Sequence, residues 1–173
     1  MEMSAQQTIG PFWHLIDQPD WWDLTRFGAA GARIAIEGRI TDGAGAAVAD
    51  AAVELFQASP ARDAVFPGYG RVAADAEGRF RFATVMPGPL PGPRGANAQQ
   101  APHCGLALHA RGLLRPLFTR IYFAGDALNA TDPLLSLVPA ARRDTLVADE
   151  TSPGVWRRDI VLQGEGETVF LDF

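Results

Sequence analysis

The sequence predicts an all-β protein: a two-sheet β-sandwich with short helices and an extended N-terminal arm. Three observations predict this class. The 18 Gly and 13 Pro are spread along the 173 residues, several short segments alternate between apolar and polar side chains, and helical patterns are scarce. Many short strands joined by turns account for all three observations. Such strands form two sheets, each apolar on one face, and the two sheets bury their apolar faces most simply against each other. A chain of this length commonly forms one compact domain.

The strands are expected where apolar and polar residues alternate with a period of two. Residues 33–41 show this alternation most regularly, and residues 51–58 repeat it. Residues 70–73 and 79–82 flank the turn at 75–78 and together predict a hairpin. Further strands are expected at 105–111, 118–123 and 156–163, with 168–173 as a last strand or an extended tail.

Two segments differ from the strand pattern. Residues 1–28 carry several large aromatic side chains without alternation, Trp13, Trp21, Trp22 and Phe27 among them, so we expect an arm that covers a surface of the sandwich or of a partner. Residues 131–148 predict one or two short helices, because Asp132-Pro133 is a helix start signal and Pro139 interrupts the pattern. We therefore divide the chain into an arm, residues 1–28, and a sandwich domain, residues 29–173.

Composition argues against several classes of function. The net charge is −5, and the 15 basic residues are spread without a dense cluster, which argues against nucleic-acid binding. No apolar stretch approaches the roughly 18 residues of a membrane helix. The N-terminal residues do not follow the pattern of a signal peptide, and a single cysteine, Cys104, suits a reducing compartment, so we expect a cytoplasmic protein.

Few side chains offer chemistry on their own. His103 and Cys104 are adjacent, and neighbours on a strand point to opposite faces, so the pair does not easily ligate one ion. We expect Cys104 to be a buried, inert thiol and His109 a polar residue on the outer face. Arg111, at the end of an expected strand, is an ion-pair residue or an anion anchor, and the residues alone favour the ion pair.

Six blocks span nearly the whole chain in order: TIGPFW, VELFQASP, FPGYGRVAADAEGRFRFATVMPGP, APHCGLALHARGLL, TRIYFAGD and QGEGETVFLDF. Together they resemble the intradiol ring-cleaving dioxygenases, which implies a β-sandwich core flanked by short helices and loops. HARGLL and QGEGETVFLDF are similar to one chain type within that family, the alpha subunit that pairs with a homologous beta subunit.

The resemblance also implies where a metal would bind. Catalytic members of the family hold a non-haem Fe(III) with two tyrosines and two histidines. The matching positions here are Ala64, Leu90, His103 and Gly105, so three of the four ligands are absent. The resemblance therefore implies no metal site and no catalytic residue on this chain, with Fe(III) bound by the partner beta subunit.

The activity implied by the resemblance is cleavage of 3,4-dihydroxybenzoate by O₂ to 3-carboxy-cis,cis-muconate in the partner's site. Thr8, Gly10, Pro11 and Arg111 match residues that complete the substrate pocket, and alpha-beta protomers are expected to form a higher (alpha-beta)n oligomer. Glycine lets backbone approach the ring closely, and an arginine attracts an anionic substrate. Two alternatives remain: a stand-alone dioxygenase with other ligands, and a non-catalytic β-sandwich binding module.

Overall fold

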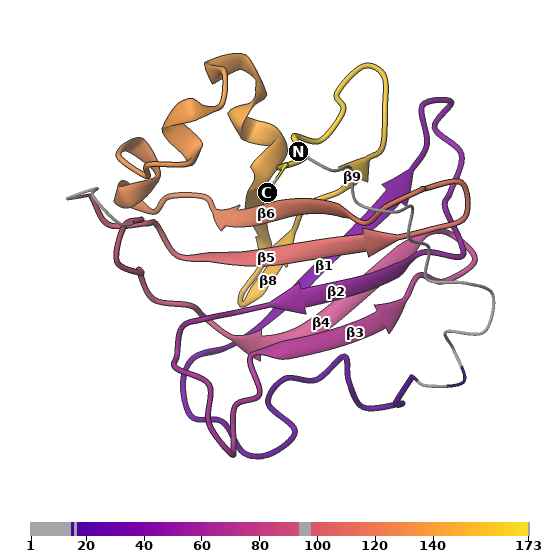
Figure 1. The fold of residues 1–173 in the computed structure, drawn as a ribbon. Helices are drawn as coiled ribbons and strands as arrows, with labels where there is room; N and C mark the ends of the chain where they lie inside the picture. Colours follow the sequence, from indigo (N-terminus) through magenta and orange to yellow (C-terminus); the bar gives the residue numbers. More distant parts are fainter. Residues whose placement is uncertain (1–14, 16, 94–97, 173) are drawn as a thin grey trace, which may run out of the picture.

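The computed structural model describes residues 15, 17–93 and 98–172, and it confirms the all-β class (Figure 1). The strands in chain order are β1 (Arg33–Thr41), β2 (Ala52–Phe56), β3 (Tyr69–Ala73), β4 (Arg79–Val85), β5 (His103–His109), β6 (Leu117–Phe123), β7 (Val147–Ser152), β8 (Val155–Arg157) and β9 (Ile160–Val161). Three short 3₁₀ helices lie between β6 and β7: η2 (Ala127–Ala130), η3 (Leu135–Leu137) and η4 (Ala140–Leu146). Within the described ranges, no helix has the length and apolar character needed to cross a membrane.

The strands form two layers joined along one side (Figure 1). The strand order is β3-β2-β5-β6-β7-β8-β1-β4, and β9 pairs with β1. Strand β7 makes the connection, because its first residues pair with β6 and its later residues pair with β8. The layer β3-β2-β5-β6 therefore faces the layer β8-β1-β4.

The main hydrophobic core lies between these layers. Each strand turns alternate residues inward, as the period-two pattern predicted. The inward side chains include Ile36, Leu55 and Phe82, all fully buried, and Leu106 and Ile121 with 1% exposure. Both layers contribute to one cluster, so neither sheet can bury its apolar face without the other.

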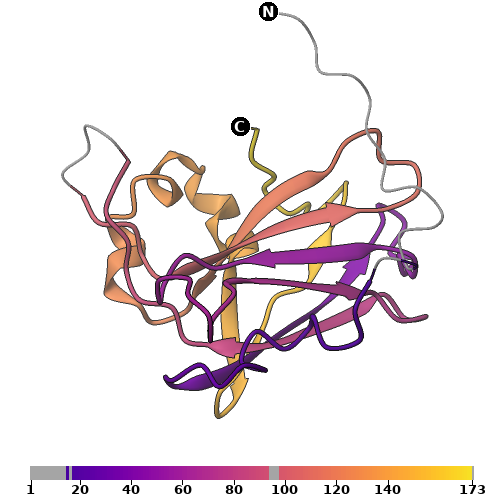
Figure 2. The same cartoon turned by 60° about the horizontal axis from the view of Figure 1, so that its bottom comes forward.

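Residues 21–24 close the side of the sandwich opposite β7. The Arg71 amide of β3 donates to the Trp21 carbonyl at 3.1 Å, and the Ala83 amide of β4 donates to the Trp22 carbonyl at 3.0 Å. Gly70 permits this approach, since a Cβ there would lie 2.6 Å from the Trp21 oxygen. The indigo segment thus bridges the free edges of β3 and β4, one in each layer, and we call residues 21–24 the edge clasp (Figure 2).

The predicted hairpin between residues 70–73 and 79–82 is wrong. Strand β3 pairs with β2, and β4 pairs with β1, so the turn at 75–78 carries the chain from one layer to the other. The reason is burial: Phe80 and Phe82 on β4 reach the core from the layer opposite β3. Alternation within each strand shows which face is apolar, but it does not show which strand lies beside it.

The segment predicted to be helical ends earlier than expected. Helices η3 and η4 lie within residues 131–148, but Val147 and Ala148 already belong to β7. The β7 sequence, VADETS, has one buried residue, Ala148, and four exposed ones, so it lacks the alternation that identifies a half-buried strand. Its pairing with both layers, and not its own pattern, makes it a strand.

The 3₁₀ helices cover one end of the outer face of β5 and β6. A second hydrophobic cluster lies there, formed by Ala101, Tyr122, Leu135, Val138 and Leu146. The rest of that outer face is not covered by these helices. The open part is where polar and aromatic side chains gather.

A buried carboxylate, that of Asp132, holds several segments together at this covered end. Asp132 has no exposed surface, and its oxygens accept from the backbone amides of Ala101, Leu134 and Leu135 at 2.8 to 2.9 Å. The Tyr122 hydroxyl also donates to it at 3.1 Å. One side chain therefore ties the start of β5, the end of β6 and the turn before η3 together.

A second polar cluster lies further along the outer face. Glu54 accepts hydrogen bonds from the Tyr69 hydroxyl at 2.8 Å and from Arg71, and His109 Nε2 lies 3.5 Å from its other oxygen. Trp21 of the edge clasp packs against Tyr69 and Arg71. The contacts with His109, Arg71 and Tyr69 lower the pKa of Glu54 to about 2, although burial opposes the shift, and burial with the Glu54 contact raises the pKa of Tyr69 to about 12.

We predict that Glu54→Gln lowers the free energy of unfolding by about 2 kcal/mol at pH 7, because the charged acceptor of several hydrogen bonds is lost. The pKa of Glu54 is below its ordinary value of 4.5 in the folded chain, so its contribution is complete above pH 4.5 and declines as the pH falls towards 2. Between pH 7 and pH 3, the free energy of unfolding of the variant should therefore fall less than that of the unmodified chain. Urea unfolding between pH 3 and 7 measures both effects.

Glu77→Gln is the matched control, since Glu77 pairs with Arg79 while both side chains are more than half exposed. Exposed pairs contribute less than about 1 kcal/mol. Equal destabilisation by the two substitutions would contradict a special role for Glu54.

Candidate functional site

Outward-facing residues of three neighbouring strands form the candidate site. Gly105 of β5 lies opposite Phe56 of β2 on one side and opposite Arg120 of β6 on the other. His103 lies opposite Tyr122, whose ring it contacts at a centroid distance of 5.6 Å. The absence of a side chain at Gly105 leaves a hollow between Phe56 and Arg120.

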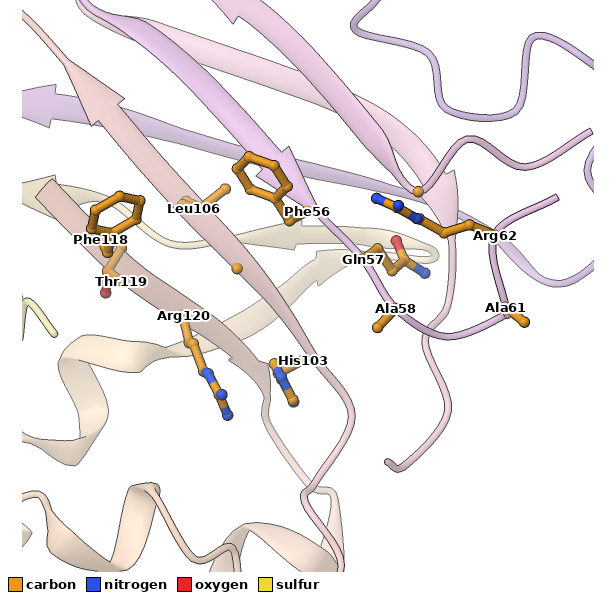
Figure 3. A pocket seen from close by; sticks show the side chains of 12 residues that line it. Phe56, Gln57, Ala58, Ala61, Arg62, His103, Leu106, Phe118, Thr119 and Arg120 are labelled. Atoms are coloured by element: carbon orange, nitrogen blue, oxygen red, sulfur yellow. The ribbon is translucent and has the colours of Figure 1, made fainter. Parts of the chain in front are cut away.

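This hollow opens into a pocket of about 700 Å³ (Figure 3). Its lining comprises Phe56, Gln57, Ala58, Ala61, Arg62, Gly68, His103, Gly105, Leu106, Phe118, Thr119 and Arg120. In Figure 3, Arg120 and His103 lie next to each other at one side of the pocket, and Arg62 lies on the loop at the other. The lining contains two arginines and no carboxylate, so the pocket is electropositive.

His103 is a neutral imidazole in this setting. Burial lowers its pKa, and the nearby charge of Arg120 acts in the same direction. Its Nδ1 is 2.8 Å from the Ala101 carbonyl, and a neutral ring donates its proton there. Nε2 then carries a lone pair, which is a single acceptor at the wall of the pocket.

Arg120 makes no direct contact with a carboxylate in the described ranges of the chain. Its Nη1 donates to Gln100 Oε1 at 2.8 Å and lies 3.4 Å from the Tyr122 hydroxyl, and both partners are neutral. Gln100 is held in turn by two backbone hydrogen bonds with Leu90. A chain of neutral groups therefore positions the guanidinium beside His103.

The residues present do not fit a ferric ion. Of the four matching positions, Ala64, Leu90 and Gly105 have no donor atom in their side chains, and His103 offers one nitrogen. In the part of the chain that the structure describes, no three His, Cys, Asp or Glu side chains are grouped so that they could hold a metal. The guanidinium of Arg120 beside His103 would also repel a cation.

Of the predicted substrate-binding residues, the structure describes only Arg111, and Arg111 does not line this pocket. Thr8, Gly10 and Pro11 lie outside the described residues. Arg111 follows the far end of β5 from His103, its side chain is 91% exposed, and its Nε pairs with Asp50. Arg111 is thus an exposed ion-pair residue at a different place on the surface.

Two other expectations about single residues agree with the structure. Cys104 is fully buried on the core side of β5, where burial raises the pKa of its thiol. His109 lies on the outer face, where it contacts Glu54.

Sequence reasoning missed Arg120, Arg62 and Phe56 as site residues. A signal for Arg120 was present. Arg120 is two residues from Phe118 and two from Tyr122, and residues two apart on a strand lie on the same face. No comparable signal marked Arg62, which lies in an irregular loop and reaches the pocket only through the fold.

Comparisons with known proteins agree with this architecture. A family model described as "Dioxygenase" matches residues 23–159. The chain is 38% identical to the protocatechuate 3,4-dioxygenase alpha chain of Burkholderia cepacia, over 99% of this chain and 98% of that one. It is 36% identical to the beta chain of the same enzyme and organism, over 80% of this chain and 67% of that one.

A solved structure shares the fold. The dioxygenase domain of a dioxygenase–carbohydrate-binding protein fusion from Streptomyces sp. SirexAA-E matches with a TM-score of 0.66 and 24% identity, covering 94% of this chain and 99% of that one. The family match covers most of the chain, and the similarity to the alpha chain extends over its full length. This chain belongs to the intradiol ring-cleaving dioxygenase family.

Proposed function

We propose that this chain is the iron-free alpha-type subunit of a protocatechuate 3,4-dioxygenase. One observation carries the proposal: the positions that match the family's iron ligands retain a single donor, His103. A chain without a ligand set acts in ring cleavage only through a partner that has one. The similarity to alpha chains over nearly the full length supports this assignment.

In this proposal the homologous beta subunit holds the Fe(III) that supplies the ring-opening chemistry with O₂. The substrate is 3,4-dihydroxybenzoate and the product 3-carboxy-cis,cis-muconate. This chain contributes shape: Thr8, Gly10 and Pro11 form a wall of the partner's pocket, orient the ring and exclude water. Arg111 lies near the mouth and attracts the carboxylate of the substrate.

The described part of the arm supports a role in pairing. Leu24 is fully buried, so the edge clasp is anchored to the sandwich. Trp22 is 43% exposed and Phe27 is 54% exposed, although aromatic side chains of this size are commonly covered. We infer that the beta subunit covers them, and that alpha-beta protomers assemble into a larger cytoplasmic (alpha-beta)n oligomer.

The first test is the iron content. Expressed alone, this chain should bind no stoichiometric iron and cleave no 3,4-dihydroxybenzoate, because one imidazole does not hold Fe(III). Co-expression with its beta subunit should give a coloured, active complex. Metal analysis and oxygen uptake measure the two outcomes, and tightly bound iron in the isolated chain would instead support a stand-alone dioxygenase.

The second test concerns Arg111. In the co-expressed complex, Arg111→Ala should lower kcat/KM at low ionic strength by roughly tenfold, because a charge that attracts the anionic substrate is removed. The difference from the unmodified complex should shrink as salt is added. Steady-state kinetics at several salt concentrations measure it.

Arg79→Ala is the matched control, because Arg79 is also an exposed, ion-paired arginine but lies on β4 in the other layer.

Deletion of residues 1–11 should reduce turnover while size-exclusion chromatography still shows a complex. Unchanged kinetics in both the Arg111 variant and the deletion would favour a non-catalytic binding module.

A further inference from the structure

The pocket beside His103 has the dimensions of a ligand site, although it does not fit a metal ion. Its volume of about 700 Å³ lies in the range typical of small-molecule pockets, roughly 300 to 1,000 Å³. The walls combine apolar surface with a few polar groups, which is the usual composition of such sites. What the pocket can hold follows from its charge and its shape.

The charge favours an anion. Arg120 uses Nη1 for its two neutral partners, and its other two guanidinium nitrogens make no hydrogen bond with the described residues. Arg62 makes neither a hydrogen bond nor an ion pair within the ranges that the structure describes, and its side chain is exposed at the pocket rim. Two cationic groups with no carboxylate in the lining create a positive potential that only an external anion can neutralise.

The shape favours an apolar body attached to that anion. Phe56 and Phe118, 41% and 39% exposed, supply apolar surface to the pocket from the two strands that flank β5 (Figure 3). A Cβ added to Gly105 would meet only Phe56, at 3.8 Å, so the space above this glycine is open. An inorganic anion would leave this apolar space unfilled.

We propose that this pocket binds a small organic carboxylate, with the carboxylate on the Arg120 guanidinium and an apolar body over Gly105 against Phe56 and Phe118. The planar guanidinium pairs with a carboxylate through two parallel hydrogen bonds. The site is non-catalytic. Two positions that match iron ligands in related chains, His103 and Gly105, thus line an anion-binding pocket in this proposal.

Benzoate is a suitable probe, because it has a carboxylate and an apolar ring but no hydroxyl groups. Benzamide is its neutral counterpart. We expect isothermal titration calorimetry to detect benzoate binding to the co-expressed complex and at least tenfold weaker binding of benzamide. Equal binding of the two probes would overturn the proposal, and so would the absence of benzoate binding.

Two variants assign the binding to this pocket. Arg120→Gln removes the charge and Gly105→Leu fills the hollow, so each should weaken benzoate binding by roughly tenfold or more. Arg115→Gln is the matched control, because Arg115 is an exposed arginine paired with Asp172 outside the pocket. This variant should bind benzoate with unchanged affinity. Circular dichroism confirms that each variant is folded, and the two pocket variants test the site independently.

The remaining outcomes also decide the question. Benzoate affinity that is the same in all variants would place the binding elsewhere, including the partner's iron. Binding to this chain alone that disappears in the complex would show that the partner covers the pocket, and it would overturn the small-ligand proposal. Benzoate binding that depends on Arg120 in a complex without ring-cleavage activity would contradict only the proposed function.

Discussion

The alternation of side chains along β5 is the constraint on which both the core and the pocket depend. Cys104, Leu106 and Leu108 point inward and are almost completely buried, so His103 and Gly105 must point outward. The strand cannot slip by one residue without exposing its apolar side chains. Packing between the layers therefore keeps these two residues on the outer face, whatever they contact there.

A second constraint acts at the start of β5. Asp132 accepts four hydrogen bonds from three parts of the chain, Ala101, Tyr122 and residues 134–135, and each donor would lose its acceptor if the side chain changed. Tyr122, one of these donors, also contacts Arg120. The position of the guanidinium is thus linked to the packing of the 3₁₀ helices, since the same carboxylate serves both.

The sequence predicted those features that depend on a residue and its near neighbours. Residues 33–41 were recognised as a strand with its exact bounds, because Ile34, Ile36 and Ile40 alternate with polar side chains. The hairpin was wrong because the partner of β4 is β1, which is nearly forty residues earlier, and no local pattern carries that information. Pairing between distant strands is settled by the shared core.

The same distinction applies to the candidate site: single residues could be predicted from the sequence, but their arrangement in space could not. The missing iron ligands could be read from single positions, such as Leu90 and Gly105, once the family was recognised. The pocket could not, because it requires Phe56, Gly105 and Arg120 from three strands to lie side by side. Arg62 adds a loop residue whose place depends on how residues 57–68 fold over the sheet.

The edge clasp has a consequence for assembly. A strand at the border of a sheet exposes unpaired amides and carbonyls, which invite another chain to add a strand and can lead to aggregation. Here the Arg71 amide of β3 and the Ala83 amide of β4 are already satisfied by the backbone of residues 21–24. Strand addition at these two borders is therefore disfavoured, and a partner that approaches them would meet the side chains of the edge clasp.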